Sequence, residues 1–202
     1  MNTSLKSIAV YCGASMGADP VYADAARALA QALVEHNIAL VYGGGKVGLM
    51  GVIADEVLRL GGDVTGVIPQ ALLAREVGHA GLTRLFVVKD MHERKAMMAQ
   101  LSDGFIAMPG GMGTLEELFE MVTWAQLGIH AKPIGLLNVN GFYDGLRAFV
   151  GHQVAEGFVR PEHEDLMIAD SDPDLLIQRL RAAAPLALTS SLPAAAADEL
   201  KG

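Results

Sequence analysis

One stretch of this sequence decides its fold: Phe105-Ile106-Ala107-Met108-Pro109-Gly110-Gly111-Met112-Gly113-Thr114-Leu115-Glu116-Glu117. It begins with an apolar run of the length of a short buried strand and continues through a glycine-rich turn into a segment of helical period. A strand, a tight turn and a helix in this order make up half of a βαβ unit. If the same order recurs on both sides of this stretch, the chain forms a parallel sheet.

The same order does recur along the chain. Short runs of apolar and β-branched residues alternate with longer segments of helical period. The runs are nearly all apolar rather than alternating with polar residues, as expected for strands that helices cover on both faces. The predicted strands are Ile8–Cys12, Ala39–Tyr42, Val64–Ile68, Leu85–Val88, Phe105–Met108 and Ile134–Leu137; the predicted helices are Pro20–His36, Leu49–Leu60, His92–Leu101, Thr114–Leu127, Tyr143–Glu156 and Pro173–Ala184. The sequence therefore predicts a Rossmann-like α/β fold with a doubly wound parallel sheet.

The domain organisation follows from length and from a change of composition near the end of the chain. A chain of 202 residues is long enough to bury one core without disulfides or a structural metal. We predict a single Rossmann-like domain over residues 1–184. After about Pro185 the amphipathic period is lost and an alanine run follows, so residues 185–202 are predicted to be a flexible tail. A short helix that packs on a partner subunit is the alternative.

Composition excludes several classes of protein. The hydrophobic fraction is 51%, but no uninterrupted apolar stretch approaches the roughly 20 residues of a membrane-spanning helix. The first residues lack the pattern of a signal peptide, so we expect a cytoplasmic protein with no membrane contact. The net charge of −8 argues against nucleic-acid binding. The only cysteine, Cys12, excludes an intramolecular disulfide, and we interpret it as a buried apolar residue rather than a catalytic thiol.

The glycine-rich turn predicts a phosphate-binding site. Ligands of open α/β sheets bind beyond the carboxyl ends of the strands, which is where this turn lies. Its glycines let backbone N–H groups approach a ligand, and the following helix start adds unpaired N–H donors and partial positive charge. The alternative is a purely structural helix start, in which Thr114 is the N-cap and Glu117 completes a capping box. Glu116 and Glu117 would repel a phosphate unless they contact another part of the ligand.

Two cations precede this turn in Met91-His92-Glu93-Arg94-Lys95, which opens the helix after the fourth predicted strand. Arg94 and Lys95 therefore lie near the carboxyl end of the sheet. Cations in the first turn of a helix oppose the helix dipole, which lowers stability slightly. This placement favours a ligand-binding role for both residues over a solvated surface.

A second glycine-rich loop follows the second predicted strand, in Gly43-Gly44-Gly45-Lys46-Val47-Gly48. It matches the dinucleotide pattern G-x-G-x-x-G, but the nearby acid, Asp63, precedes the next strand instead of ending it. It is not a Walker P-loop either, because Val47 stands where that motif requires Ser or Thr. We predict that Gly43, Gly44, Gly45 and Gly48 shape a mononucleotide pocket or permit close packing of helix on sheet.

Taken together, the three stretches closely resemble the LOG ("lonely guy") family, cytokinin riboside 5′-monophosphate phosphoribohydrolases that are often labelled lysine decarboxylases. The likeness runs from about Ser7 to Ala184 and includes Thr123-Trp124-Ala125-Gln126-Leu127-Gly128. It implies a Rossmann-like homodimer that hydrolyses an N⁶-substituted adenosine monophosphate, or AMP itself, to free base and ribose 5-phosphate. No metal or other cofactor is expected.

The resemblance also implies which residues form the site. Arg94 and Glu117 match the catalytic pair of the family. The positions that match its substrate-binding residues are Glu76, Lys95, Gly110, Gly111, Met112, Gly113, Thr114, Leu115, Glu116 and Thr123.

The expected chemistry is that of an N-glycosidase, which passes through an oxocarbenium-like transition state. Glu117 is expected to stabilise the ribosyl cation and to orient or deprotonate the attacking water, and Glu116 to hold ribose hydroxyls. Arg94 stabilises the departing base or helps to hold the phosphate; arginine is a poor proton donor, so its role is electrostatic. Two alternatives are a nucleotide sensor without catalysis and, from the historic label alone, a lysine decarboxylase dependent on pyridoxal phosphate.

Overall fold

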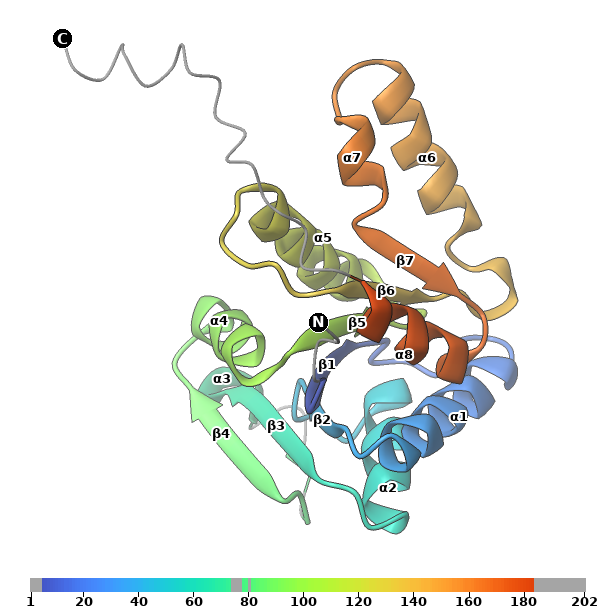
Figure 1. Ribbon diagram of the computed structural model, residues 1–202. Coiled ribbons are helices and arrows are strands. Elements are labelled where there is room, and N and C mark those ends of the chain that lie inside the picture. Colours follow the sequence, from blue (N-terminus) through green and yellow to red (C-terminus); the bar gives the residue numbers. More distant parts are fainter. Residues whose placement is uncertain (1–4, 74–77, 80, 184–202) are drawn as a thin grey trace, which may run out of the picture.

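A single parallel sheet forms the centre of the molecule. The structure is a computed structural model that describes residues 5–73, 78–79 and 81–183, and within these residues it contains seven strands (Figure 1). Their order across the sheet is β4-β3-β2-β1-β5-β6-β7, and all neighbours are parallel. The strands are β1 (Ser7–Tyr11), β2 (Ala39–Tyr42), β3 (Val64–Pro69), β4 (Arg84–Val88), β5 (Gly104–Ala107), β6 (Ile134–Leu137) and β7 (Met167–Asp170).

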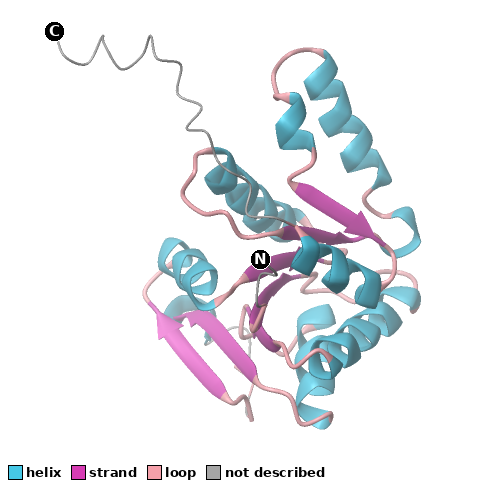
Figure 2. Cartoon of the chain, viewed as in Figure 1, coloured by secondary structure: helices cyan, strands magenta, loops and turns pink. Residues whose placement is uncertain are grey.

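Helices cover both faces of this sheet, which confirms the doubly wound fold (Figures 1 and 2). On one face lie α1 (Val21–Glu35), α2 (Gly48–Arg59) and α8 (Pro173–Ala182). On the other lie α4 (Met91–Leu101), α5 (Met112–Gln126) and α6 (Asp144–Ala155). The short elements α3 (Gln70–Leu73), η1 (Val139–Gly141) and α7 (Pro161–Glu164) belong to connections.

The apolar run of β1 shows why the strands carry apolar residues on both faces of the sheet. Ile8 and Val10 pack in the core under α1, α2 and α8, whereas Ala9 and Tyr11 pack in the core under α4 and α5. Successive side chains of a strand point to opposite faces, so a strand that is covered twice is apolar at every position.

The strand order changes direction between β1 and β5. The chain runs outward from β1 through β2 and β3 to β4, and then returns to the other side of β1 to continue through β5 and β6 to β7. Just beyond this point the backbone N–H of Gly13 donates to the Pro109 carbonyl at 3.1 Å. Open α/β sheets bind ligands at such a switch point, so the fold itself indicates where the site lies.

The predicted strands agree with the structure to within one residue at each end, but β7 was not predicted. The sequence Met167-Ile168-Ala169-Asp170 is short, ends on an acid and pairs only with β6 at the edge of the sheet. The connecting elements α3, η1 and α7 were not predicted either, because each is a single short turn. The predicted tail, residues 185–202, lies outside the described residues.

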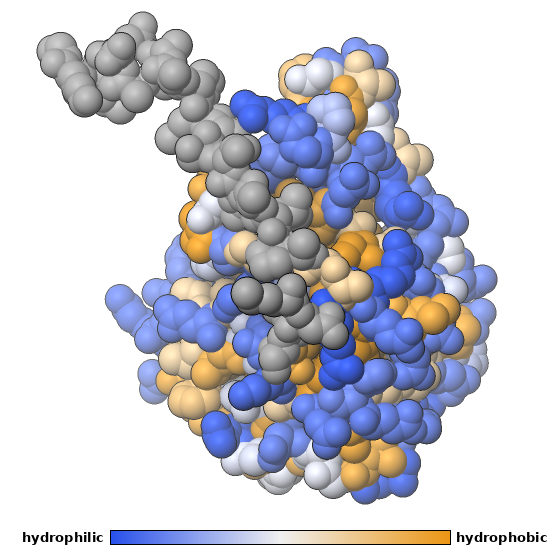
Figure 3. All heavy atoms as spheres, in the orientation of Figure 1, coloured by the Kyte–Doolittle hydropathy of each residue, from blue (hydrophilic) through white to orange (hydrophobic). Residues whose placement is uncertain are grey.

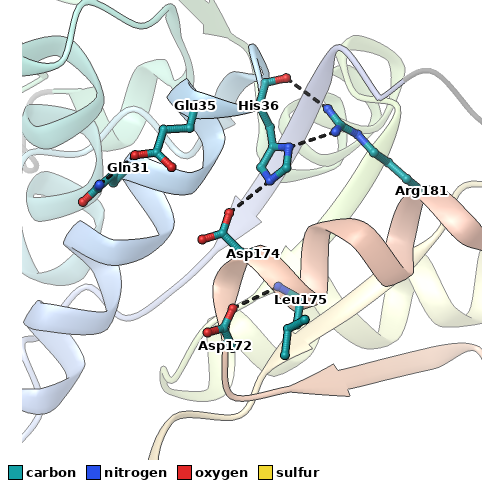
Figure 4. Close-up of polar contacts among 7 residues, drawn as sticks. All are labelled: Gln31, Glu35, His36, Asp172, Asp174, Leu175 and Arg181. Carbon is teal, nitrogen blue, oxygen red and sulfur yellow. Dashed lines mark hydrogen bonds and ion pairs between the residues drawn. The ribbon is translucent and has the colours of Figure 1, made fainter.

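Polar contacts fix α8 against the end of α1 (Figure 4). The guanidinium of Arg181 donates to Nδ1 of His36 at 2.9 Å and to its carbonyl at 3.0 Å, and Nε2 of His36 lies 3.0 Å from Asp174. Because arginine only donates, Nδ1 accepts and Nε2 carries the hydrogen that Asp174 receives. One histidine thus connects both ends of α8 to the rest of the fold.

The surface combines charged residues with separate apolar groups. On the face in Figure 3, hydrophobic patches lie between hydrophilic residues. Large exposed apolar side chains include Leu127, Ile129, Phe149 and Phe158. In the part of the chain that is described, no helix is long and apolar enough to cross a bilayer.

Candidate active site

A cavity of about 440 Å³ opens at the switch point of the sheet. Its walls come from the end of β1, from the loops after β1, β2 and β5, and from the first turns of α2, α4 and α5. Among the lining residues are Tyr11, Cys12, Gly13, Ser15, Gly43, Met50, Met91, Arg94, Gly110, Gly111, Gly113, Thr114, Glu116 and Glu117. The three stretches that the sequence singled out therefore meet around one cavity.

Backbone contacts fix the loops around this cavity. The N–H of Leu49 donates to the Gly13 carbonyl at 3.0 Å, which joins the loop after β2 to the loop after β1. Gly110 approaches its neighbours so closely that a Cβ there would overlap Oγ1 of Thr114 and lie 2.9 Å from the Gly13 nitrogen. A glycine is therefore required at position 110 by packing.

The start of α5 corrects one prediction. The helix begins at Met112 with Gly111 as its N-cap, and no side chain of the described residues caps it. Thr114 is thus buried inside the first turn, so the predicted helix start at Thr114 is wrong, and the alternative of a capping box from Thr114 to Glu117 is excluded. The extended backbone of Gly111 lets the helix start earlier than Thr114, and the first N–H groups of α5 consequently lie beside the cavity without a side-chain cap. This strengthens the interpretation of the turn as an anion site.

A buried ion pair lies in the wall of the cavity. Nη2 of Arg94, from α4, is 3.3 Å from Oε1 of Glu117, from α5, and each side chain is 10% exposed. Burial raises the pKa of Glu117 above the usual value of a glutamate, and the Arg94 guanidinium opposes this rise. The site therefore places a fixed cation and a desolvated carboxylate side by side.

Two acidic side chains cap the turn that carries Arg94. The Asp90 carboxylate accepts from the N–H of Glu93 at 2.9 Å, and the Glu93 carboxylate accepts from the N–H of Lys89 at 2.7 Å. Both acids lie at the positive end of the helix dipole, where they compensate for the nearby cations.

We expect Asp90→Ala to lower the melting temperature by about 2–4 °C, because the Glu93 N–H loses its acceptor. Thermal unfolding followed by circular dichroism measures this change. Asp172→Ala is the matched control, since Asp172 caps α8 in the same way through the Leu175 N–H, far from the cavity. An unchanged melting temperature for the Asp90 variant would show that the cap is dispensable.

Lys95 has a different environment from Arg94. Its Nζ pairs with Glu116 and, at 3.1 Å, with Glu120, and the side chain is 5% exposed. Burial acts to lower the pKa of Lys95, but its interactions with the two glutamate carboxylates outweigh burial and raise that pKa. The Lys95 ammonium is therefore charged and held by α5.

Comparison with known proteins identifies relatives of this chain. Residues 50–180 match the model of the family described as "Possible lysine decarboxylase". The chain is 46% identical over 186 residues to the cytokinin riboside 5′-monophosphate phosphoribohydrolase LOG5 of Arabidopsis thaliana, covering 92% of this chain and 82% of that protein. It is 48% identical over 180 residues to LOG1 of the same plant, covering 89% and 84%.

The chain belongs to the LOG family. Comparison with solved structures supports the fold of this chain and nothing more. The molybdenum cofactor carrier protein of Chlamydomonas reinhardtii superposes with a TM-score of 0.67 at 20% identity, over 89% of this chain and 99% of that one.

The residues that LOG membership implies for the substrate are only partly brought together. Gly110, Gly111, Gly113, Thr114 and Glu116 line the cavity; Lys95, Met112, Leu115 and Thr123 are not among its lining residues. Met112 is 84% exposed, and Thr123 is exposed near the other end of α5. Glu76 lies outside the described residues.

Of the four glycines predicted to shape the pocket, Gly43 lines the cavity. Gly44 and Gly48 have positive φ angles of 77° and 58°, which the loop after β2 requires. Gly45 forms an isolated antiparallel bridge with Gly78. These three glycines shape the loop rather than the wall of the cavity.

Sequence reasoning missed an apolar part of the wall. Met16, Tyr22 and Phe142 line the cavity, and the rings of Tyr22 and Phe142 meet edge to face with centroids 6.0 Å apart. Phe142 follows β6, so its position beyond a strand end was the available signal. Cys12 is buried as predicted, and burial raises the pKa of its thiol, which makes a catalytic thiolate unfavourable.

Proposed function

We propose that this protein hydrolyses the base–ribose bond of a nucleoside 5′-monophosphate, either a cytokinin riboside 5′-monophosphate or AMP. The products are the free base and ribose 5-phosphate. One observation carries the proposal: a buried Arg94–Glu117 pair lies in the same cavity as the uncapped start of α5. The names of the relatives at 46% and 48% identity support the same reaction.

The 5′-phosphate is proposed to bind at the start of α5. Gly111, Gly113 and Thr114 line the cavity there, and backbone N–H groups at a helix start bind anions without a lysine. The helix dipole adds roughly 0.3–2 kcal/mol before specific hydrogen bonds are counted. Gly110 allows the close approach between this turn and Gly13.

The sugar and the base are proposed to lie against the charged pair. As the C1′–N bond breaks, positive charge develops on the ribose beside Glu117, and negative charge develops on the base beside Arg94. A water molecule, oriented by Glu117, forms the new C1′–O bond; one of its protons passes to that carboxylate, which releases it to solvent, and the departing base takes up a proton from solvent water. Glu116 lines the cavity and is proposed to hold ribose hydroxyls.

The test is incubation of purified protein with AMP and with isopentenyladenosine monophosphate, followed by chromatography of the free base. We expect equimolar base and ribose 5-phosphate from at least one nucleotide, and little cleavage of adenosine because it lacks the phosphate. Tight binding of AMP without release of base would instead identify a nucleotide sensor. Lysine decarboxylation with a bound pyridoxal phosphate spectrum would overturn the proposal.

We expect kcat/KM for base release to fall at acid pH, with the midpoint above the range of an exposed glutamate. Catalysis requires ionised Glu117, and burial raises the pKa of this group, so protonation removes the charge at a higher pH. The pH profile of kcat/KM measures this midpoint. An acid limb at or below the ordinary glutamate range would contradict the assignment of Glu117.

We also propose that the protein is a cytoplasmic homodimer. A second subunit on the outer side of α5 would cover Leu127 and Ile129, which are 63% and 61% exposed. It would also give the exposed Thr123 a route to a nucleotide, in the pocket of the partner. Light scattering after size-exclusion chromatography should then give twice the chain mass of 21.3 kDa. The monomer mass would overturn this arrangement.

A further inference from the structure

Two neighbouring cations of α4 meet three carboxylates of α5. Arg94 pairs with Glu117 in the cavity wall, whereas Lys95 pairs with Glu116 and Glu120. Adjacent residues of a helix point in directions about 100° apart, so the two cations lie in different surroundings. The resemblance implies that Arg94 is catalytic and that Lys95 binds the substrate, but of the two only Arg94 lines the cavity.

The Lys95 ammonium is buried between two carboxylates. Its side chain is 5% exposed, and those of Glu120 and Glu116 are 22% and 53% exposed. A buried ammonium requires carboxylate partners, because removing one leaves a charge without water or counterion. Lys95 is thus committed to α5, and Glu120 is the more buried of its two partners.

These ion pairs join the two helices beside the cavity. Arg94 and Lys95 are adjacent in α4, and their partners Glu116, Glu117 and Glu120 follow one another closely in α5. Apolar side chains of the same helices, such as Met98 and Met121, bury them on the sheet. Lys95 is thus tied to the stretch of α5 that carries Glu117, so its ion pairs constrain how Arg94 lies relative to Glu117.

We propose that Glu120 is a positioning residue, and that the Lys95–Glu120 ion pair fixes α4 against α5 so that Arg94 stays beside Glu117. This inference rests on the proposed phosphoribohydrolase function for its kinetic consequence. Glu120 does not line the cavity, so it acts only through Lys95. Lys95, in turn, acts on the helices and does not bind the nucleotide.

The first experiment is the variant Glu120→Gln, which keeps the shape of the side chain and removes its charge. We expect kcat to fall about 10-fold, because a displacement of about 1 Å in a catalytic group can cost up to about 100-fold. KM for AMP should stay within about twofold of wild type, since the proposed phosphate site is made of backbone groups. Lys95→Met should lower kcat at least as much, and Lys95→Arg should recover part of the loss.

Lys132→Met is the matched control. The Lys132 ammonium also holds α4, through the Ala99 carbonyl at 2.6 Å, but at the end of the helix that is remote from the cavity. We expect this variant to keep wild-type kcat and KM, even if its melting temperature falls. The double variant Lys95→Met/Glu120→Gln should show no lower kcat than Lys95→Met alone, because both changes break the same pair.

Each other outcome overturns the inference. A higher KM with unchanged kcat in Lys95→Met would make Lys95 a substrate ligand, and wild-type kcat in Glu120→Gln would remove Glu120 from catalysis. A crystal structure of Glu120→Gln tests the inference without an activity assay. We expect the Arg94–Glu117 distance to differ from 3.3 Å, and an unchanged distance would overturn the positioning role of Glu120. If the wild-type protein releases no base, the proposed function fails. If the wild-type protein is active and Glu120→Gln is equally active, the function stands and only this inference fails.

Discussion

Glu117→Gln is expected to lower kcat for base release by about three orders of magnitude, while nucleotide binding stays close to wild type. The amide has nearly the shape of the carboxylate but carries no charge for the ribosyl cation and cannot take a proton from water. Such acid–base and electrostatic contributions are worth about 10²–10⁴-fold each. Binding should survive because the proposed phosphate site consists of backbone groups at the start of α5.

Single-turnover cleavage of AMP and calorimetric titration with AMP separate the two effects. Glu35→Gln is the control: it makes the same chemical change on the exposed end of α1, and it should leave both measurements unchanged. If Glu117→Gln instead loses binding and catalysis to the same extent, the carboxylate serves the structure of the cavity wall. Its buried pairing with Arg94 would then be the cause, since one partner alone leaves an uncompensated charge.

The parts of the site that could be predicted depend on local sequence. The turn from Pro109 to Thr114 carries its glycines and its helix start within a few residues, so the amino-acid order alone indicates an anion site there. Arg94 was recognisable for a similar reason, because a cation in the first turn of a helix is unfavourable without a partner. The confirmed strands were all apolar runs, as expected for strands covered on both faces, although the edge strand β4 is apolar and exposes Leu85, Phe86 and Val87.

The parts that could not be predicted depend on helix phase and on distant packing. The sequence pattern does not distinguish Arg94 from Lys95. The two side chains point about 100° apart around the helix axis, so Arg94 lines the cavity and Lys95 pairs with α5. The wall that Tyr22 and Phe142 form joins α1 to the loop after β6, segments that only the sheet order brings together. The start of α5 was misplaced because an uncapped glycine start resembles the turn before a Thr cap.

Gly43→Ala is expected to lower kcat about 100-fold without unfolding the protein. A Cβ at this position would overlap Nη2 of Arg94 and lie 3.1 Å from its Cζ, so the guanidinium has to move. Apart from Glu117, 3.3 Å from Nη2, little holds the guanidinium: Nη1 lies 3.6 Å from the Met91 sulfur, and among the described residues Nε has no hydrogen-bond partner. Since the overlap is with the end of a flexible side chain, the fold absorbs it, whereas catalysis depends on the placement of the charge.

Steady-state kinetics and thermal unfolding of Gly43→Ala test this expectation, with Gly145→Ala as control because a Cβ at Gly145, on α6, meets nothing within 4 Å. A melting temperature close to wild type with a large loss of kcat assigns the effect to Arg94. The decisive comparison is made in an Arg94→Met background, where the added methyl group should lower kcat little further if it acts through the guanidinium alone. A full additional loss there would mean that Gly43 contributes by itself, through direct contact between its backbone and the nucleotide.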